Sequence, residues 1–544
     1  MNDKNKTLYA AVKDSAALFP DKTALLFLGA KIDYASFIRD IDAVAGFLVG
    51  LGIQKDDAVT VCMPNIPQCA VVFYAASKIG AVAHMVHPLA PKAQLAEYMD
   101  SVKSKLLVLP DIMIDKYEEL ILSKKTLLCS PAHYLGFVRR ILFSLKTMPL
   151  VNRVKKSENV YFYSDAVKCM PPSEPDFADP QATAVYLHSG GTGGHPKTIE
   201  LSSRAINALT DNGMEILGIT SFNGGCMLAV LPMFHGFGLA MGMHAMLCHG
   251  GCNTLMPKFH TYDTIKLIEQ NKINYLIGVP VLYNALLSKP EFSGEKLKNL
   301  RQAFVGGDYV PKKLLEDFNA RMSENGSSAR LYEGYGLTET VTVCAVNTTY
   351  AHRDGSVGKP VRGITIRAFS EDLKPLETGK TGELCIAGDE LMNGYYGDPE
   401  ATNRAFFVYD GVKYVRSGDI GYVDEDGFVY FVSRIKRIAK VSGVNVFPSE
   451  IERLTMDEIE KIKETCAVAA PDERTGEAIV LFVSLKDKTE DRESFAEYVC
   501  DFIEQRLSPF ARPKKVFFVD EFPKTLIGKV DSNKLKQIYL SDKI

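Results

Sequence analysis

Short apolar runs alternate with amphipathic stretches along most of the chain. The runs are rich in apolar and β-branched residues, as in CMLAVLP, INYLIGV, RQAFVGG and GELCIAG, and helical stretches separate them. Runs of this kind predict buried strands, and strands that alternate with helices are typical of parallel sheets. We therefore predict an α/β fold whose large N-terminal domain, residues 1–433, consists of stacked mixed sheets and helices.

The most apolar segment of the chain begins at Ala70 and reads AVVFYAASKIGAVAHMVHPL. Lys78, His84 and His87 interrupt it, whereas a membrane-spanning helix needs about 20 residues with few or no charges. We expect a buried helix that leads into a strand.

The pattern changes near Arg434, where the density of charged residues rises. The segments SEIERLTMDEIEKIKE, AIVLFVSL, ESFAEYVCDFIEQRL and VFFVDEF predict alternating helices and strands with a core of their own. We place a domain boundary in SRIKRIAKV and predict a smaller α+β C-terminal domain, residues 434–544.

Composition narrows the class of protein without indicating its chemistry. The 544 residues are 46% hydrophobic and 24% charged with a net charge of -3, as in globular proteins, and no basic excess suggests a nucleic-acid partner. The N-terminus, MNDKNKTLYAAVKDSAALF, does not resemble a secretory signal, so we expect a cytoplasmic protein.

The eleven cysteines follow no regular spacing, and an odd number cannot all pair within one chain, so we predict reduced thiols. The densest group of possible metal ligands comprises His244, Cys248, His249 and Cys252. It lies in the apolar run LAMGMHAMLCHGGC without a second ligand pair nearby, which favours a packed core over a metal site.

The strongest sign of a phosphate site is YLHSGGTGGHPKTIELSSR. A strand-like run enters a glycine-rich loop that ends at Lys197, and we predict that a helix starts at Ser202 or Ser203. Glycines let backbone amides approach phosphate oxygens, and Ser189 and Thr192 add hydroxyl donors.

Two other nucleotide motifs do not fit this loop. The loop of P-loop NTPases requires glycine directly before its lysine, where this chain has Pro196, which lacks an N–H group. The dinucleotide motif G-x-G-x-x-G fails at the same residue.

Three further segments carry polar groups suited to a nucleotide. In LYEGYGLTET, Tyr335, Thr338 and Glu339 offer an aromatic face, a hydroxyl and a carboxylate, which suit a base, a phosphate and Mg²⁺. In YVRSGDIGYVDEDG we expect Asp419 in a loop before a hairpin, where a local turn role is the alternative to binding ribose. Lys529 lies in PKTLIGKVDSNKL, and such a lysine taken alone is usually solvated.

Taken in order, these segments resemble the adenylate-forming superfamily of acyl- and aryl-CoA synthetases, carrier-protein adenylation domains and firefly-type luciferases. The resemblance spans nearly the whole chain and rests on the phosphate loop together with LPMFHGFGL, VGGDYV, YGLTET, GELCIAGDELMNGYY, YVRSGD, SRIKRIAKVSGVNVFPSEIE and the late GK. It implies an enzyme that uses ATP and Mg²⁺ to join a carboxylic acid to AMP and then transfers the acyl group to coenzyme A.

The resemblance also implies roles for individual residues. The β- and γ-phosphates would be held by Ser189, Gly191, Thr192 and Lys197. The adenine pocket would be lined by Gly307, Asp308, Glu333, Gly334 and Tyr335, with Tyr335 stacking. The reacting groups and the ribose would be contacted by Thr338 (α-phosphate), Glu339 (Mg²⁺), Asp419 and Arg434 (ribose), His235 (acyl pocket) and Lys529 (carboxylate and α-phosphate).

The smaller domain would rotate about a hinge at Lys436, which removes Lys529 and brings Gly443 to the coenzyme A tunnel. Four positions depart from the usual pattern: Gly193, Thr198, Ser442 and Asn445. The first two predict altered ATP affinity, and the last two affect contacts of the second conformation.

The acid substrate is less well defined by the sequence. A medium- or long-chain fatty acid is favoured, and the alternatives are an aryl acid, an enzyme that loads a carrier protein, and a nucleotide-binding scaffold without activity. Residues 131–157 carry six basic residues and no acid, with Phe137, Ile141 and Leu145 at helical spacing. This segment predicts either a basic amphipathic element on the inner face of an anionic membrane or a surface helix whose apolar edge packs on the large domain.

Overall fold

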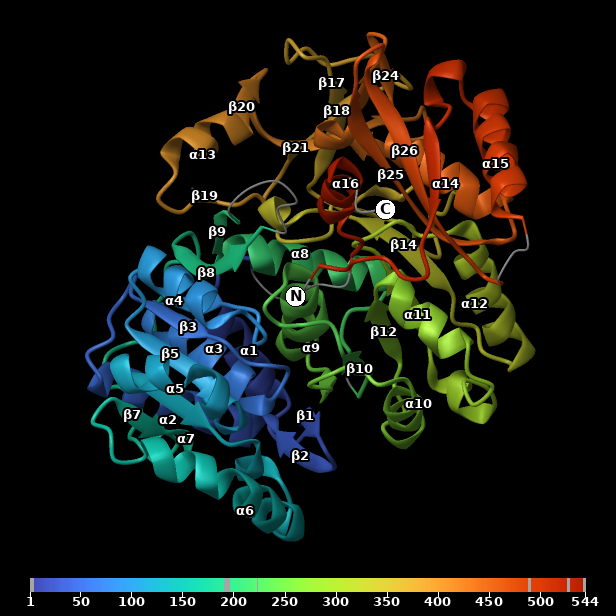
Figure 1. The fold of residues 1–544 in the computed structure, drawn as a ribbon. Helices are drawn as coiled ribbons and strands as arrows, with labels where there is room; N and C mark the ends of the chain where they lie inside the picture. Colours follow the sequence, from blue (N-terminus) through green and yellow to red (C-terminus); the bar gives the residue numbers. More distant parts are fainter. Residues whose placement is uncertain (1–3, 190–195, 223, 488–490, 526–528, 542–544) are drawn as a thin grey trace.

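The computed structural model describes residues 4–189, 196–222, 224–487, 491–525 and 529–541. Four sheets are present in this part of the chain, three in the N-terminal part and one near the C-terminus (Figure 1). The predicted α/β class with a smaller α+β C-terminal part is confirmed.

The first large sheet has nine strands, and the six from β14 to β1 run parallel. In spatial order its strands are β16 (Lys359–Pro360), β15 (Ala345–Val346), β14 (Leu331–Tyr335), β13 (Gln302–Val305), β12 (Tyr275–Gly278), β10 (Cys226–Ala229), β11 (Cys252–Leu255), β1 (Thr23–Phe27) and β2 (Ala30–Asp33). Four of its parallel strands, β10, β11, β12 and β1, are mostly or fully buried, which explains their nearly continuous apolar runs.

The second large sheet has eight strands and ends in the antiparallel pair that carries the phosphate loop. In spatial order these are β19 (Gly394–Tyr395), β9 (Thr198–Ser202), β8 (Thr183–His188), β4 (Val82–Met85), β3 (Ala58–Val61), β5 (Leu106–Pro110), β6 (Thr126–Cys129) and β7 (Val160–Phe162).

Helices cover both large sheets, and one of them is buried along nearly its whole length. They are α1 (Leu8–Leu18), α2 (Tyr34–Gly50), α3 (Pro67–Ile79), α4 (Lys92–Ser101), α5 (Ile114–Ser123), α6 (Phe137–Val154), α7 (Tyr163–Ala166), α8 (Ser203–Leu217), α9 (Ala245–Cys248), α10 (Thr261–Gln270), α11 (Pro280–Leu287) and α12 (Lys312–Glu324), with a π-helical stretch at Phe237–His244. The segment from Ala70 forms the rest of buried α3 and then β4, as predicted. Within the described residues no helix is both long enough and apolar enough to cross a bilayer.

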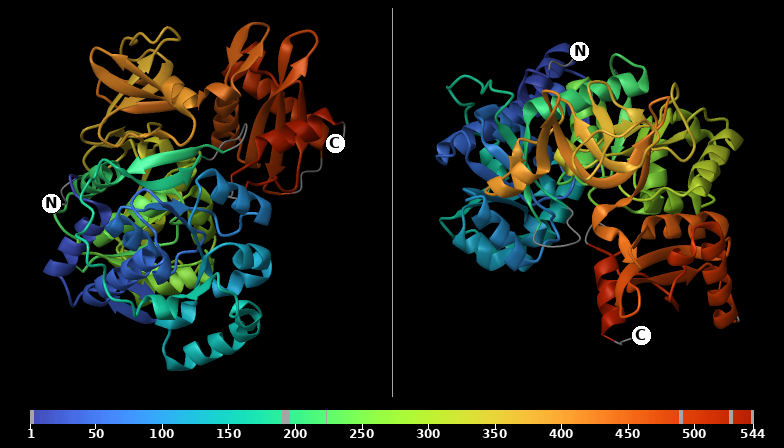
Figure 2. Two further views of the ribbon diagram at one scale, coloured as in Figure 1. Left: turned by 90° about the vertical axis from the view of Figure 1, so that its left-hand side faces the viewer. Right: turned by 90° about the horizontal axis from the view of Figure 1, so that it is seen from above.

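The third sheet is antiparallel and leads into the C-terminal part, which stands beside it in both views of Figure 2. It contains β17 (Thr365–Phe369), β18 (Gly382–Ala387), β20 (Phe406–Tyr409), β21 (Val412–Val423) and β22 (Val429–Arg434), with α13 (Pro399–Ala405) before β20. The C-terminal part contains β23 (Ala439–Val441), β24 (Val444–Val446), α14 (Pro448–Glu458), β25 (Ile462–Asp472), β26 (Gly476–Leu485), α15 (Arg492–Arg506), β27 (Lys515–Phe518) and α16 (Ser532–Leu540).

Two local predictions are wrong. Asp419 does not lie in a loop but in β21, where it pairs in register with Arg434 of β22. The helix predicted over SEIERLTMDEIEKIKE ends at Glu458, and its last residues begin β25, because β25 pairs with β26 along its length. Tertiary pairing overrides local propensity at both places.

Candidate active site

The phosphate loop connects the antiparallel strands β8 and β9, and its two ends are joined. The backbone N–H of Ser189 donates to the carbonyl oxygen of Lys197 at 2.9 Å, and the N–H of Lys197 donates to Ser189 Oγ at 3.0 Å. Helix α8 begins at Ser203 and is capped by Ser202, as predicted. Gly191, Thr192 and Gly193 lie outside the described residues.

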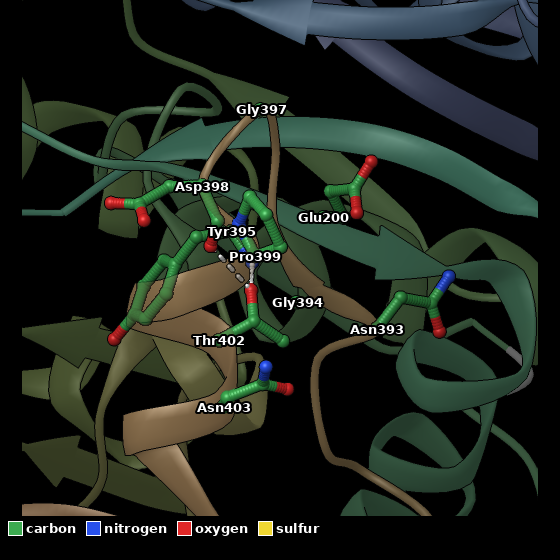
Figure 3. Close-up of a pocket in the computed structure, with 9 residues that line it drawn as sticks. All are labelled: Glu200, Asn393, Gly394, Tyr395, Gly397, Asp398, Pro399, Thr402 and Asn403. Atoms are coloured by element: carbon green, nitrogen blue, oxygen red, sulfur yellow. Dashed lines mark hydrogen bonds between the residues drawn. The ribbon is translucent and has the colours of Figure 1, made fainter.

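Lys197 and Glu339 both contact Tyr395, a residue to which the sequence analysis assigned no role. The Lys197 ammonium lies 4.3 Å from the centre of the Tyr395 ring, and the Tyr395 hydroxyl donates to Glu339 Oε1 at 2.9 Å. In Figure 3 the Tyr395 ring points away from Glu200 and Asn393, and all three residues line a cavity of about 260 Å³. The GYY motif was the only sequence signal for this contact.

Glu339 lies in a 3₁₀ turn, Thr338–Thr340, that is followed by a strained residue. Val341 has φ 64° and ψ -62°, and the N–H of Thr342 donates to the Thr340 carbonyl at 2.7 Å, which defines a γ-turn. A β-branched residue with positive φ is rare, and such strain often marks a functional segment. Gly336 permits this turn, because a Cβ at that position would lie 1.3 Å from the Thr342 carbonyl oxygen.

Tyr335, Asp419 and Arg434 form a contiguous polar group. The Tyr335 hydroxyl donates to Asp419 Oδ2 at 2.7 Å, and Arg434 Nε lies 3.3 Å from Oδ1. Asp419 is 1% exposed, and burial raises its pKa against the opposing effects of Arg434 and Tyr335. Its Oδ1 accepts no hydrogen bond from the described residues, which leaves a buried acceptor suited to a hydroxyl of a ligand.

Lys529, from the C-terminal part, reaches these residues of the N-terminal part. Burial lowers the pKa of Lys529, whereas the nearby charges of Asp308 and Asp419 favour its protonated form. Burial, with the added charge of Lys529, lowers the pKa of His235 to about 4, so His235 is neutral near pH 7. Lys529 therefore lies within electrostatic range of His235, Asp308 and Asp419.

The predicted adenine residues lie where β13 and β14 end. Gly307 and Asp308 follow β13, and Glu333 and Gly334 are in β14, next to Tyr335. Burial raises the pKa of Glu333 to about 8, and the charge of Asp457 adds to this effect against Arg453. Asp457 belongs to α14, so the C-terminal part also influences this side of the site.

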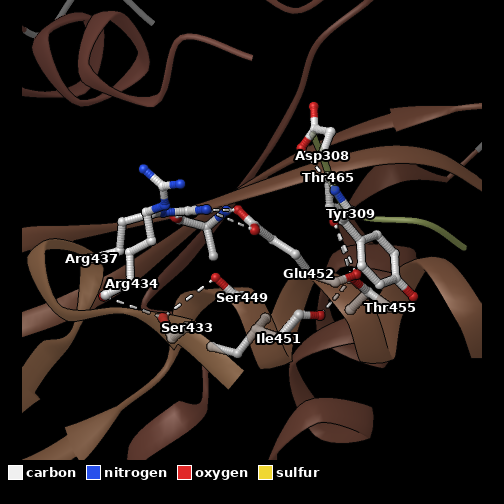
Figure 4. Close-up of polar contacts among 11 residues, drawn as sticks. Asp308, Tyr309, Ser433, Arg434, Arg437, Ser449, Ile451, Glu452, Thr455 and Thr465 are labelled. Carbon is white, nitrogen blue, oxygen red and sulfur yellow. Dashed lines mark hydrogen bonds and ion pairs between the residues drawn. The ribbon is translucent and has the colours of Figure 1, made fainter. Parts of the chain in front are cut away.

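A direct polar contact joins the two parts: the Tyr309 hydroxyl donates to Asp457 Oδ2 at 2.6 Å. Within the C-terminal part, Arg437 donates to Glu452 at 3.1 Å and to the Ala467 carbonyl at 3.0 Å, which ties the segment after β22 to α14 and β25 (Figure 4). Sequence reasoning assigned no role to Tyr309, which lies in VGGDYV, or to Asp457, because a local motif does not indicate a contact with a distant residue.

Lys436 and Gly443, the two residues assigned to the second conformation, do not contact the site residues described above. Lys436 is exposed in a 3₁₀ turn at Ile435–Arg437. Gly443 lies at the exposed turn between β23 and β24 with φ 82°, and a Cβ there would meet no atom within 4 Å. Thr338, by contrast, shares the turn of Glu339.

The histidine and cysteine group is part of the core, as predicted. His244 is fully buried and forms hydrogen bonds with Tyr74 and Asn207, at 2.9 and 2.8 Å. Cys248, His249 and Cys252 are also buried, and none of the eleven cysteines is part of a disulfide.

Comparison with known proteins gives matches over both parts of the chain. The family model for "AMP-binding enzyme" matches residues 12–396, and that for "AMP-binding enzyme C-terminal domain" matches residues 450–529. A long-chain-fatty-acid–CoA ligase of Bacillus subtilis (strain 168) is 31% identical over 97% of this chain and 93% of its own length. A 4-coumarate–CoA ligase of Nicotiana tabacum is 28% identical over 91% and 87%. The ATP-bound structure of MatB from Rhodopseudomonas palustris has the same fold, with a TM-score of 0.81, 24% identity and 99% of each chain covered.

Proposed function

The chain belongs to the AMP-binding enzymes, and on that premise we propose that its substrate is a medium- or long-chain fatty acid. It is an ATP-dependent acid:CoA ligase, which forms an acyl-adenylate and then a coenzyme A thioester, with release of pyrophosphate and AMP. The observation that carries the mechanism is the polar group of Tyr335, Asp419 and Arg434, which lies within electrostatic range of Lys529 from the C-terminal part.

The choice of a fatty acid rests on the relatives. The fatty-acid ligase of Bacillus subtilis is similar over nearly the whole of both chains. The aryl-acid ligase of Nicotiana tabacum is similar over slightly less of each and at lower identity, so an aryl acid is the second candidate.

The residues of the site suit adenylation. A carboxylate must attack the α-phosphorus of ATP, which gathers negative charge on the attacking oxygen and the α-phosphate. The partly buried ammonium of Lys529 would stabilise that charge, and neutral His235 would border the acid without adding a competing charge. Asp419 Oδ1 would accept a ribose hydroxyl while Arg434 and Tyr335 hold the carboxylate in place.

Mg²⁺ fits the donor set that is present. The described residues contain no group of three acidic, histidine or cysteine side chains placed to hold a metal, whereas Glu339 offers one carboxylate beside the phosphate loop. Mg²⁺ is commonly bound by one or two carboxylates together with substrate phosphates. When bound, it would offset the charge of the phosphates, with Glu339 as its protein ligand.

We divide the chain into domains at 433/434. In support, β22 ends at Arg434 and the C-terminal sheet begins at Ala439. The thiol of coenzyme A must later reach the carbonyl carbon near which Lys529 lies, so the C-terminal domain would turn about Lys436 and present Gly443 instead.

Pyrophosphate release tests the proposed substrate. Purified protein would be given ATP, Mg²⁺ and a panel of saturated and aromatic acids, with and without coenzyme A. Fatty acids should give the highest kcat/KM, with a thioester formed only when coenzyme A is present. Preference for aromatic acids would select the second candidate, and product on a carrier protein but not on coenzyme A would exclude a ligase of this type.

Peripheral contact with an anionic membrane is a second part of the proposal, and α6 supports it. The apolar side chains of α6 are divided: Val154 is buried in the large domain, whereas Phe137 is 79% exposed and Leu142 63% exposed. A cavity of about 520 Å³ is lined by Phe137 and Leu145 of α6 together with Leu128 of β6 and Phe162 of β7. Basic residues flank this face without an intervening acid, as in helices that lie on anionic bilayers.

Since the chain contains no tryptophan, Leu142→Trp would provide a single fluorescent reporter on α6. Its emission should shift to shorter wavelength with vesicles rich in anionic lipid and not with purely zwitterionic vesicles. Leu540→Trp on α16 is the matched control, since Leu540 is exposed by 54% on the C-terminal domain. An unshifted Leu142→Trp spectrum at low salt would end the membrane proposal and leave the ligase proposal untouched.

A further inference from the structure

Tyr395 lies between the lysine that ends the phosphate loop and the carboxylate assigned to the metal. Its hydroxyl donates to Glu339 Oε1 at 2.9 Å, and its ring centre lies 4.3 Å from Lys197 Nζ, within the range of a cation–π contact. One side chain therefore contacts two oppositely charged groups through two different chemical features.

The backbone fixes this arrangement from both sides. Tyr395 pairs with Ile199 where β19 meets β9, and its N–H donates to Thr402 Oγ1 at 2.9 Å (Figure 3). In the same segment, the Met392 N–H donates to the Glu339 carbonyl at 2.8 Å. The distance between the phosphate loop and the Glu339 turn is thus set by residues 392–395.

The hydroxyl of Tyr395 is the donor in this hydrogen bond, because a carboxylate oxygen can only accept. The bond therefore engages one carboxylate oxygen of Glu339 and leaves the other oxygen for a hard cation, which favours oxygen ligands.

We propose that Tyr395 is a positioning residue for adenylation: its hydroxyl orients Glu339 toward the metal, and its ring holds Lys197 until phosphate oxygens take the ammonium. The inference rests on the proposed function, because it assumes that Mg²⁺ and ATP bind between these groups. Groups that orient a metal ligand commonly affect metal affinity or activity by about 10–100-fold when they are removed.

Two substitutions separate the two roles. Tyr395→Phe keeps the ring and removes the hydroxyl, so the Mg²⁺ concentration for half-maximal ATP binding in calorimetry should rise about tenfold or more. The KM for ATP at saturating Mg²⁺ should stay within about twofold, because the ring still holds Lys197. Tyr395→Leu removes both features and should raise that KM as well.

Tyr396→Phe is the matched control, because the Tyr396 ring packs on Tyr186 instead, with ring centres 4.9 Å apart. The Mg²⁺ dependence of this variant should equal that of the unmodified chain. A double-mutant cycle adds a readout that a purely structural role would not move: in a Glu339→Gln background, Tyr395→Phe should have no further effect on Mg²⁺ dependence.

An unchanged Mg²⁺ dependence in folded Tyr395→Phe, or additive effects in the cycle, would overturn the inference. Binding of ATP and Mg²⁺ is measured without any acid, so a failure of this inference is distinguishable from a failure of the proposed function. The proposed function would fail if the unmodified protein released no pyrophosphate with any acid.

Discussion

Lys529 is the residue on which the two half-reactions place opposite demands. Adenylation needs its charge beside Asp308 and Asp419, whereas thioester formation needs the same space for a thiol. A residue with this position should therefore be essential for one step and dispensable for the other.

For Lys529→Ala we expect acyl-adenylate formation to fall by about 100-fold or more, as when a preorganised charge-stabilising group is removed. Thioester formation from synthetic acyl-adenylate should stay within about threefold of the unmodified rate, since that step needs the lysine to be absent. Pyrophosphate release and thioester absorbance measure the two steps separately. Equal losses in both, in a variant with an unchanged melting temperature, would contradict the assigned role.

Glu333 makes stability depend on pH. Its folded pKa is about 8, above its ordinary value near 4.5, so the folded state holds the proton more tightly than the unfolded state. That stabilisation is complete below pH 4.5 and is lost as pH rises through 8, with a limiting slope of roughly 1.4 kcal/mol per pH unit. Urea unfolding of the chain and of Glu333→Gln at pH 5.5 and 8 should show a larger loss for the unmodified chain. Parallel pH profiles would mean that Glu333 ionises normally.

At the scale of elements, local sequence patterns predicted the helices and strands whose position depends on residues close together in the sequence. The helix and strand after Ala70 and the start of α8 at Ser203 were predicted, because periodicity and a serine cap act within a few residues. Asp419 was placed in a loop because Ser-Gly-Asp is a turn signal, and the pairing of β21 with β18 and β22 overrides it.

The 3₁₀ turn after β22 is the element on which the hinge proposal can be tested. Lys436 is exposed there, and a 3₁₀ turn has φ near -60°, which proline also adopts. Lys436→Pro should therefore hold the present arrangement, in which Lys529 lies beside Asp419. We expect one burst of pyrophosphate at a near-normal rate, with acyl-CoA production reduced by about tenfold or more.

The control for this variant is Lys436→Ala, which removes the same side chain and leaves φ free. Acyl-CoA formation at the unmodified rate by folded Lys436→Pro would place the hinge elsewhere, or show that both steps proceed without rotation.

At the scale of the whole molecule, the contacts between the two parts were beyond the reach of the sequence. Tyr309 and Asp457 are 148 positions apart, and Tyr395 and Glu339 are 56 apart. Nothing in the spacing of such residues indicates that they touch, because their approach follows from how complete sheets pack. Tyr309 and Tyr395 lie in the quoted motifs VGGDYV and GELCIAGDELMNGYY, but a motif does not show which distant residue its side chain contacts.

Tyr309→Phe should weaken the arrangement that supports adenylation. It removes a hydroxyl that donates to the Asp457 carboxylate, and bonds to charged groups contribute roughly 1.5–3 kcal/mol. We expect adenylation to be slower by about three- to tenfold. We also expect faster tryptic cleavage after the exposed basic residues Arg434 and Lys436. Tyr332→Phe is a control that leaves Asp457 bonded, because the Tyr332 hydroxyl instead pairs with Thr349 Oγ1 at 3.0 Å. An unchanged cleavage rate would mean that the contact between Tyr309 and Asp457 does not hold the two domains together.

The pairing of β1 with β11 has a consequence for synthesis of the chain. Leu25 and Leu26 lie beside Asn253 and Thr254, so β1 cannot complete its sheet until β11 has left the ribosome. At roughly 5–20 residues per second, that wait is on the order of ten to fifty seconds, during which β2 alone can pair with it. A nascent chain with an unpaired apolar strand for so long is a natural client of chaperones that shield such segments. Fragments that end before Cys252 should aggregate when expressed, and a shortened protein is better cut just before Arg434.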